Sequence, residues 1–222
     1  VFLEPDLAER VGAHLLVADS ANHLIRAINL ETKLVSTIAG TGDQWMQADP
    51  TNGNALEVKI STPWDIEVFG DILLIAMAGE HRIWMYDFED KTLGVFAGTT
   101  NEGLVDGVIH EAWFAQPSAL VHSKLTPGKV WIIDAETSAL RATENGMITS
   151  LVGKGLFDFG HVDGPADQAL LQHPLGVLEL PDGNVLIADT YNRAIRKYSP
   201  SNNQVSTVAR DLAEPSDMEI IQ

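Results

Sequence analysis

Val185-Leu186-Ile187-Ala188-Asp189 is an apolar run that ends in aspartate, and three similar runs stand earlier in the chain, at residues 15–19, 73–77 and 130–134. Each follows a proline that opens another short apolar run. The four prolines are Pro5, Pro63, Pro117 and Pro174. A repeat of about 55 residues that carries several short strands is typical of β-propeller blades, which bury their faces only against neighbouring blades.

Other positions recur in the same register. The residues that end the runs are Asp19, Met77, Asp134 and Asp189, and seven residues later stand Arg26, Trp84, Arg141 and Arg196. Each unit then has a further β-rich run, at residues 35–40, 94–98, 148–153 and 205–209. Turn formers such as Pro181-Asp182-Gly183 separate the strands, so tight hairpins and antiparallel pairing are expected.

The repeats therefore predict an all-β fold, a β-propeller of four-stranded antiparallel blades, with about four blades in this chain. All 222 residues belong to one array in this interpretation. The predicted blades span residues 5–62, 63–116, 117–173 and 174–214. In the first three, a long connection leads to the next proline, and helix formers in it predict a short helical turn over the blade junction.

The segment 215–222 resembles the start of a blade, because Pro215-Ser216-Asp217 matches Pro63-Trp64-Asp65. It is either the first strand of a further blade or a strand that closes the first blade. Closure would remove exposed sheet edges. We favour a further blade, since Pro5 already opens the first unit and closure needs an unpaired blade.

Charge and composition narrow the classes of partner. The chain has 14 Lys plus Arg against 31 Asp plus Glu, and its formal charge of -17 repels phosphate backbones, so nucleic acid is not an expected partner. The chain has no cysteine, which excludes a disulfide framework and a thiol nucleophile in it. Its apolar runs are too short to span a bilayer, so no membrane association is expected. The compartment stays open, with the cytoplasm favoured.

Two segments resemble the core of the NHL repeat: Asp19-Ser20-Ala21-Asn22-His23-Leu24-Ile25-Arg26 and the corresponding residues 189–196. The resemblance extends over nearly the whole chain, including Phe114-Ala115-Gln116-Pro117-Ser118. It implies a six-bladed propeller, often preceded by a thioredoxin-like domain. At the observed period this chain holds about four blades of such a ring, and it contains no thioredoxin cysteine pair.

The aspartate and arginine seven residues apart flank a hairpin, where their side chains can meet and hydrogen-bond the turn. Asparagine suits the tight turn between them, because it tolerates a positive φ. We therefore assign a structural role to this repeat motif. Its members are Asp19, Asn22, Arg26, Asp134, Arg141, Asp189, Asn192 and Arg196. In the second unit Met77 and Trp84 replace both partners with apolar residues, as expected of a packing pair.

No catalytic residue, metal site or cofactor site is predicted. His23 and His81 share one turn position, four residues after Asp19 and Met77, and the other histidines lack a spacing typical of metal ligands. A lyase built on NHL-like repeats uses a metal near its propeller axis. A metal-dependent lyase or hydrolase that uses the central pocket is therefore the alternative function, although an enzyme is less expected than a scaffold.

The favoured function is a non-catalytic scaffold that binds a protein or a peptide, as part of a larger protein. The inter-blade connections and the turns after Asp19, Asp134 and Asp189 should emerge on one face. Candidate binding residues on or beside these connections are Trp64, Asp65, Trp113 and His173. Exposed aromatic side chains are typical interface anchors. In the competing interpretation, both tryptophans seal blade junctions, since large aromatics also dominate core packing.

Overall fold

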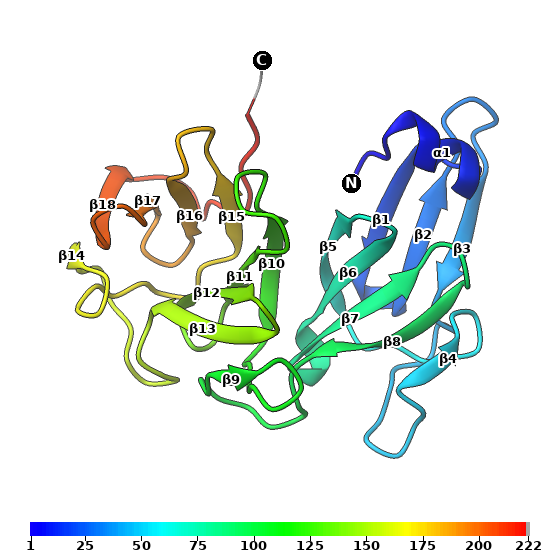
Figure 1. Ribbon diagram of the computed structural model, residues 1–222, viewed down its shortest axis with the longest axis horizontal. Helices are drawn as coiled ribbons and strands as arrows, with labels where there is room; N and C mark the ends of the chain where they lie inside the picture. The colour runs from blue at the N-terminus through cyan, green and yellow to red at the C-terminus, as the bar shows by residue number, and fades with distance from the viewer. Residues whose placement is uncertain (221–222) are drawn as a thin grey trace.

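The computed structural model describes residues 1–220 and contains four antiparallel sheets (Figure 1). The first sheet consists of β1 (Leu15–Asp19), β2 (Leu24–Ile28) and β3 (Val35–Ala39). The second consists of β5 (Pro63–Phe69), β6 (Ile72–Met77), β7 (Arg82–Asp87) and β8 (Thr92–Ala97), with β4 (Asn52–Asn54) beside β8. These elements establish the predicted all-β class.

The third and fourth sheets repeat this order. The third consists of β10 (Pro117–His122), β11 (Val130–Asp134), β12 (Ala139–Glu144) and β13 (Met147–Val152), with β9 (Gly107–Val108) beside β13. The fourth consists of β15 (Gly176–Glu179), β16 (Val185–Asp189), β17 (Ala194–Ser199) and β18 (Gln204–Ala209), with β14 (Gly164–Pro165) beside β18. We call the four sheets blades 1 to 4.

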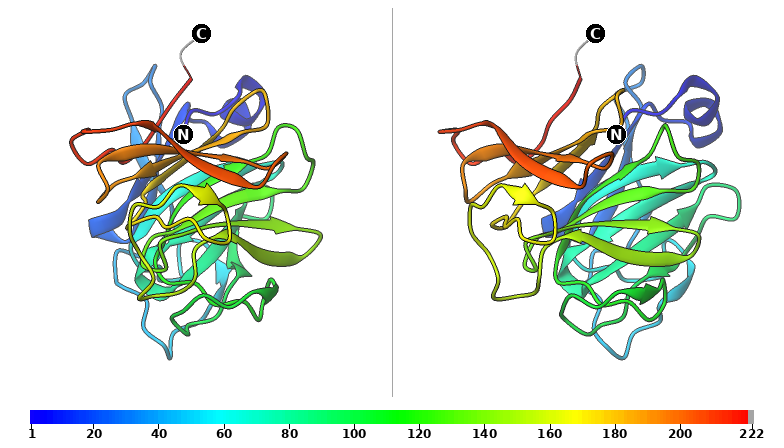
Figure 2. Two further views of the ribbon diagram at one scale, coloured as in Figure 1. Left: turned by 90° about the vertical axis from the view of Figure 1, so that its left-hand side faces the viewer. Right: turned by 60° about the vertical axis from the view of Figure 1, so that its left-hand side comes forward.

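The blades are arranged in chain order. Strand β1 of blade 1 contacts β5, and the inner strands of the next blades follow, because β5 contacts β10 and β10 contacts β15. Blades 1 and 4 lie on opposite sides of the molecule in Figure 1. Figure 2 shows blade 4, in yellow to red, beside the green blade 3, with the first two blades behind them. This is a propeller-type array, and the larger ring of six blades stays a prediction.

Blades 2 to 4 have five strands, where the sequence predicts four. The connection that precedes each blade contributes the additional strand at its outer edge: β4 pairs with β8, β9 with β13 and β14 with β18. Outer strands expose unpaired backbone groups, and the added strand satisfies some of them. The predicted helical turn follows as a single turn, because the amides of Val58, Ala112 and Ala169 each donate to the carbonyl four residues earlier.

The prediction of a strand opened by Pro5 is wrong. Pro5–Val11 forms the helix α1, and Gly12 ends it. Proline is favourable at a helix start, where Asp6 also faces the positive end of the helix dipole, and Arg10 lies in the last turn. Beside β1, the inner position is taken by the chain start, where Val1 and Leu16 exchange backbone hydrogen bonds of 2.8 and 2.9 Å.

The core lies within and between the blades. Strand β6 is almost wholly buried, and both Met77 and Trp84 have no exposed surface and belong to the cluster shared by blades 1 and 2. A second cluster joins blade 2 to blade 3 around Phe114 and Ile132. A third joins blade 3 to blade 4 around Trp131 and Ile187. Each apolar face is therefore buried against the next blade, as the repeat predicts.

Between residues 1 and 220, no helix combines the length and the apolar character that a bilayer crossing requires.

Candidate binding surface at the junction of blades 3 and 4

In blades 3 and 4 the arginine of the repeat motif holds the preceding connection against the blade. In blade 3 the Arg141 side chain is fully buried, and its Nη1 lies 3.3 Å from Oδ2 of Asp134. Its Nη2 donates to Oδ1 of Asp106 at 3.0 Å and to the carbonyl of Val105 at 2.8 Å. Nη1 also donates to the carbonyl of Trp113. Arg141 thus joins β12 to two separate parts of the preceding connection.

Arg196 makes the corresponding contacts in blade 4. It pairs with buried Asp189 and with Asp163, both at 2.7 Å. It also donates to the carbonyls of Leu170 at 3.0 Å and Val162 at 2.8 Å. In Arg196 the Nε, Nη1 and Nη2 atoms all have partners on the blade or on its connection, and this arrangement makes a buried charge tolerable. In Arg141 both Nη atoms are paired in the same way, and the buried Nε has no hydrogen-bond partner among the described residues.

The aspartates complete this network from the blade side. Asp134 accepts the backbone N–H of Ala115 at 2.7 Å, and Asp189 accepts that of Gln172 at 2.8 Å. Burial raises the pKa of Asp134 to about 6, although Arg141 and these hydrogen bonds oppose the rise. The side chain of Asn192 donates to Asp189 at 2.8 Å. All these contacts fix loops in place, and they bring no reactive group to a surface.

Blade 1 carries the same motif with fewer contacts. Asn22 donates to Asp19 at 2.8 Å, as Asn192 does to Asp189. Arg26 forms no ion pair with the described residues, and its buried Nε finds no hydrogen-bond partner among them. Arg141 and Arg196 each pair with an aspartate from the preceding connection, Asp106 or Asp163. Among residues 1–220, no such connection precedes blade 1 to supply an aspartate to Arg26.

In blade 2 a different ion pair takes over this role. Arg82 pairs with buried Glu80, and its guanidinium lies 4.6 Å from the ring of Trp45, which belongs to the preceding connection. Sequence reasoning missed this arrangement. The available signal was the charged pair itself. At the position of Glu80 the other units carry Asn or Thr, and at the position of Arg82 they carry Leu or Ala.

The two turn histidines join successive blades. His23 and His81 adopt left-handed backbone conformations and accept, at Nδ1, the N–H of Thr62 and of Gln116, at 3.1 and 3.2 Å. Thr62 and Gln116 directly precede the prolines that open the next blades. In the described part of the chain, no group of three or more His, Asp or Glu is arranged to hold a metal ion.

Two of the predicted binding residues, Trp64 and Asp65, line a pocket of about 510 Å³ among the inner strands β5, β10 and β15. Trp64 is 38% exposed. The carboxylate of Asp65 accepts the N–H of Leu120 at 2.7 Å and of Ile66 at 2.8 Å, so it joins blade 2 to blade 3. Burial raises the pKa of Asp65 to about 7, although these hydrogen bonds oppose the rise.

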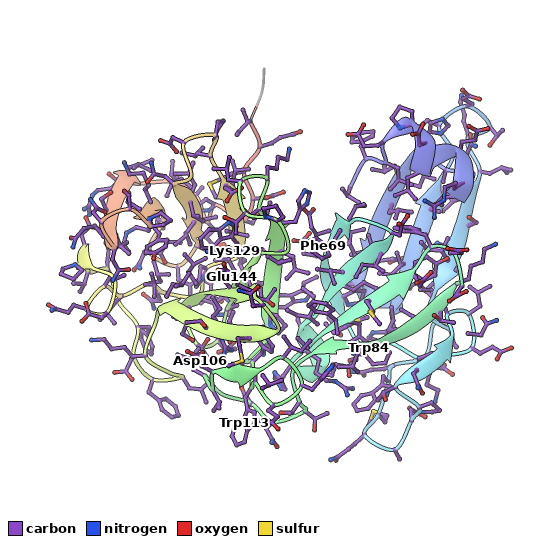
Figure 3. The ribbon with its side chains drawn as sticks, in the orientation of Figure 1. Phe69, Trp84, Asp106, Trp113, Lys129 and Glu144 are labelled. Atoms are coloured by element: carbon purple, nitrogen blue, oxygen red, sulfur yellow. The ribbon has the colours of Figure 1, made fainter. Side chains whose placement is uncertain are left out.

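The other two predicted residues lie elsewhere. Trp113 is half-buried in the connection before blade 3, among the loops at the lower edge of Figure 3, and its backbone bonds to Val105. His173 lies at the next junction, between blades 3 and 4. The structure thus brings Trp64 and Asp65 together and separates them from Trp113 and His173.

His173 is part of an exposed aromatic group. Its ring stacks on Tyr191 with 4.5 Å between centroids and 22° between planes. Tyr191 is 57% exposed and Phe159 is 55% exposed. Together with Glu136 they line a pocket of about 160 Å³. We call Glu136, Phe159, His173 and Tyr191 the aromatic junction.

Three elements build the aromatic junction. Glu136 lies in the turn after β11, Tyr191 in the turn after β16, and Phe159 and His173 in the connection between blades 3 and 4. Phe157, which is 89% exposed, stands in the same connection. Sequence reasoning identified only His173 of this set. The available signal was length, because this connection has two more residues between Gly153 and Gly164 than its counterpart has between Gly98 and Gly107.

The neighbouring junction provides an internal comparison. Glu136 and Tyr191 are equivalent, since their amides donate to Ala115 and Gln172 in the same way, at 3.1 and 3.2 Å. By the same register, the counterparts of Glu136 and His173 between blades 2 and 3 are Gly79 and Gln116. The aromatic junction therefore departs from the repeat, and the repeat architecture does not require its side chains.

Comparison with known proteins supports the family resemblance. No family model matches the chain. The chain is 39% identical to human NHL repeat-containing protein 2 over 88% of its own length, and 38% identical to the Bos taurus protein over the same share. It spans 31% of the length of each of these relatives.

Solved structures show the same fold at low sequence identity. An auxiliary nutrient binding protein from Bacteroides thetaiotaomicron is 19% identical with a TM-score of 0.59, over 86% of this chain and 44% of that one. Virginiamycin B lyase from Staphylococcus aureus, solved with quinupristin, is 15% identical with a TM-score of 0.54, over 91% of this chain and 57% of that one. At such identities the likeness concerns the propeller fold alone.

Proposed function

Because this chain carries NHL-type repeats related to those of NHL repeat-containing protein 2, we propose that it is a non-catalytic scaffold that binds a peptide segment of another protein. The observation that supports this proposal is the aromatic junction. It combines large exposed aromatic side chains with a small pocket and a carboxylate on one surface. Aromatic side chains grouped in this way are typical anchors of protein interfaces.

The loops that carry the aromatic junction are held in place by the network around Arg196. Asn192 donates to the carbonyl of Gly160 at 2.7 Å, which ties the turn of Tyr191 to the connection of Phe159. The N–H of Gly160 donates to Leu171 at 2.9 Å, and Gln172 donates to Asp189. A surface whose loops are already ordered loses less conformational entropy when a partner binds.

A protein partner fits the charge of the chain better than a nucleic acid does. The formal charge of -17 opposes binding of phosphate backbones and attracts basic segments. The alternative function, a metal-dependent lyase or hydrolase, stays a prediction; among residues 1–220, no group of three or more His, Asp or Glu is arranged to hold a metal ion.

Peptide selection tests the proposal. A random peptide library displayed on phage would be panned against the protein, and the selected peptides titrated against variants by fluorescence polarisation. We expect Tyr191→Ala and Phe159→Ala to weaken binding by about tenfold each, the size of a moderate interface anchor. The matched control is Phe2→Ala, because Phe2 is 72% exposed and lies at the chain start. Equal binding by all three variants, or no selected peptide, would contradict the proposal.

The tryptophans named from the sequence need separate tests, since they lie apart. Trp64→Ala probes the pocket among the inner strands β5, β10 and β15, and Trp113→Ala probes the junction of blades 2 and 3. If the selected peptides bind at the aromatic junction, both variants retain wild-type affinity. A loss of affinity confined to Trp64→Ala would instead place the binding site at the pocket among the inner strands.

A further inference from the structure

We propose that the aromatic junction recognises an arginine side chain of the bound peptide, with Glu136 as the carboxylate partner and Tyr191 and Phe159 as the aromatic walls. This inference rests on the proposed function and names the chemistry of its site. The pocket of the aromatic junction is acidic and aromatic, and its lining includes neither lysine nor arginine among the described residues.

Glu136 has capacity for a cationic ligand. Its side chain is 40% exposed, and in the described part of the chain its one ion-pair contact is with Nδ1 of His173, at 3.6 Å. That distance is longer than a hydrogen bond. A guanidinium can donate two parallel hydrogen bonds to such a carboxylate, and this geometry distinguishes arginine from lysine.

The aromatic walls suit a planar cation. His173 covers one face of the Tyr191 ring, and the high exposure of Tyr191 shows that much of its side chain stays accessible. Phe159 contributes a second exposed ring to the same pocket. Guanidinium groups stack on aromatic faces within about 6 Å, and the attraction grows as water is displaced.

The chain uses this combination twice in its own interior. In blade 2 the guanidinium of Arg82 lies 4.6 Å from the ring of Trp45 and pairs with Glu80. In blade 3 the guanidinium of Arg141 lies 4.5 Å from Phe114 and pairs with Asp134. At the aromatic junction the carboxylate and the rings are present at the surface, so an external arginine would complete the same set.

The size of the pocket decides what kind of ligand it accepts. About 160 Å³ is smaller than the roughly 300–1,000 Å³ of typical small-molecule sites. It suits one side chain whose backbone continues along the surface. Exposed Phe157 stands two residues from Phe159, where it can contact the residues that flank the arginine. The negative charge of the chain favours the approach of a basic peptide.

The first experiment uses the smallest probe, so that it does not depend on finding a peptide. N-acetyl-arginine-amide would be titrated at millimolar concentration into the labelled protein, followed by NMR of the Tyr191 and His173 rings. Citrulline amide, which has the same shape without the charge, is the comparison ligand. We expect saturable shifts with arginine that are at least fivefold weaker with citrulline. Equal responses to both, or no response, would overturn the inference.

The second experiment tests the assigned residues. Glu136→Gln keeps the size of the side chain and removes its charge, and it should weaken arginine binding about tenfold, the effect of losing one charge-assisted contact. Glu111→Gln is the matched control, because Glu111 is exposed in the corresponding connection before blade 3. Unchanged affinity of Glu136→Gln, with Tyr191→Ala also unchanged, would place arginine elsewhere and overturn the assignment.

The two proposals fail in different ways. Selected peptides that bind through Tyr191, yet bind equally when arginine is replaced by citrulline, would contradict the arginine inference and support the scaffold. Failure of every peptide would contradict the scaffold. If every peptide failed but N-acetyl-arginine-amide bound the wild-type protein and not Glu136→Gln, the result would support arginine recognition by the pocket without supporting the scaffold.

Discussion

At the scale of single residues, the buried arginines are the main structural use of charge in this protein. Arg141 and Arg196 have fully buried side chains, and each contacts two aspartates and two backbone carbonyls. Because a guanidinium has five donors in a plane, one side chain can join a strand, a turn and a connection. These contacts explain why an arginine side chain can be fully buried at this position of blades 3 and 4.

We predict that Arg196→Met lowers the free energy of unfolding by about 3–5 kcal/mol, because it leaves the buried carboxylate of Asp189 without its cation. Urea denaturation measures the change. The control is Arg210→Met, since Arg210 is 60% exposed and lies 3.8 Å from Asp163, and pairs of this kind contribute about 0–1 kcal/mol. A loss below about 1 kcal/mol in Arg196→Met would show that the network is dispensable.

At the scale of elements, the junction between consecutive blades depends on a close backbone approach. Gly98 follows β8 with φ of 93°, and a Cβ built there would lie 2.9 Å from Phe114 and 3.1 Å from the carbonyl of His81. The last strand of blade 2 must leave its sheet beside the turn histidine and beneath the helical turn of the next connection. A side chain does not fit in this space.

We expect Gly98→Ala to destabilise the protein by about 2–4 kcal/mol, from positive-φ strain together with overpacking against Phe114. Gly146→Ala is the control, because Gly146 also has a positive φ, of 75°, with nothing within 4 Å of the added Cβ. It should cost about 1 kcal/mol. Thermal or urea unfolding of both variants measures the difference, and equal losses would contradict a close approach at Gly98.

At the scale of the whole molecule, acidic side chains on the inner strands join one blade to the next. Asp65 accepts the N–H of Leu120 from blade 3, and Glu179 accepts contacts from Ser123 and Trp131. Burial raises the pKa of Asp65, and the nearby negative charges of Glu67 and Asp217 raise the pKa of this carboxyl further. The stability of the array should therefore depend on pH.

For Asp65 the folded state binds the proton more tightly than the unfolded state, since burial raises its pKa from 3.8 to about 7. Its contribution to stability is complete below pH 4 and is lost as pH rises toward 7, by at most about 1.4 kcal/mol per pH unit. Asp65→Asn should flatten the decline of unfolding free energy between pH 5 and about 7.5. Exposed Asp43→Asn should leave the decline unchanged, and an unchanged slope in both variants would contradict the prediction.

The sequence by itself determined the repeat. Alternating apolar runs, turn residues and the Asp and Arg spacing are local features, and they predict antiparallel blades because strands and hairpins form from neighbouring residues. The order of the strands within each blade followed from the same features. The first unit was the exception, since Pro5 suits a helix start as well as a strand start, and the residues that follow decided between them.

Only the tertiary structure decided what the connections do. They add a fifth strand to each of three blades, and they carry Asp106 and Asp163 to arginines that lie 35 and 33 residues away in the chain. The aromatic junction likewise draws Glu136, Phe159, His173 and Tyr191 from two turns and one connection. No spacing rule encodes such a group, because its geometry depends on how one blade packs on the next.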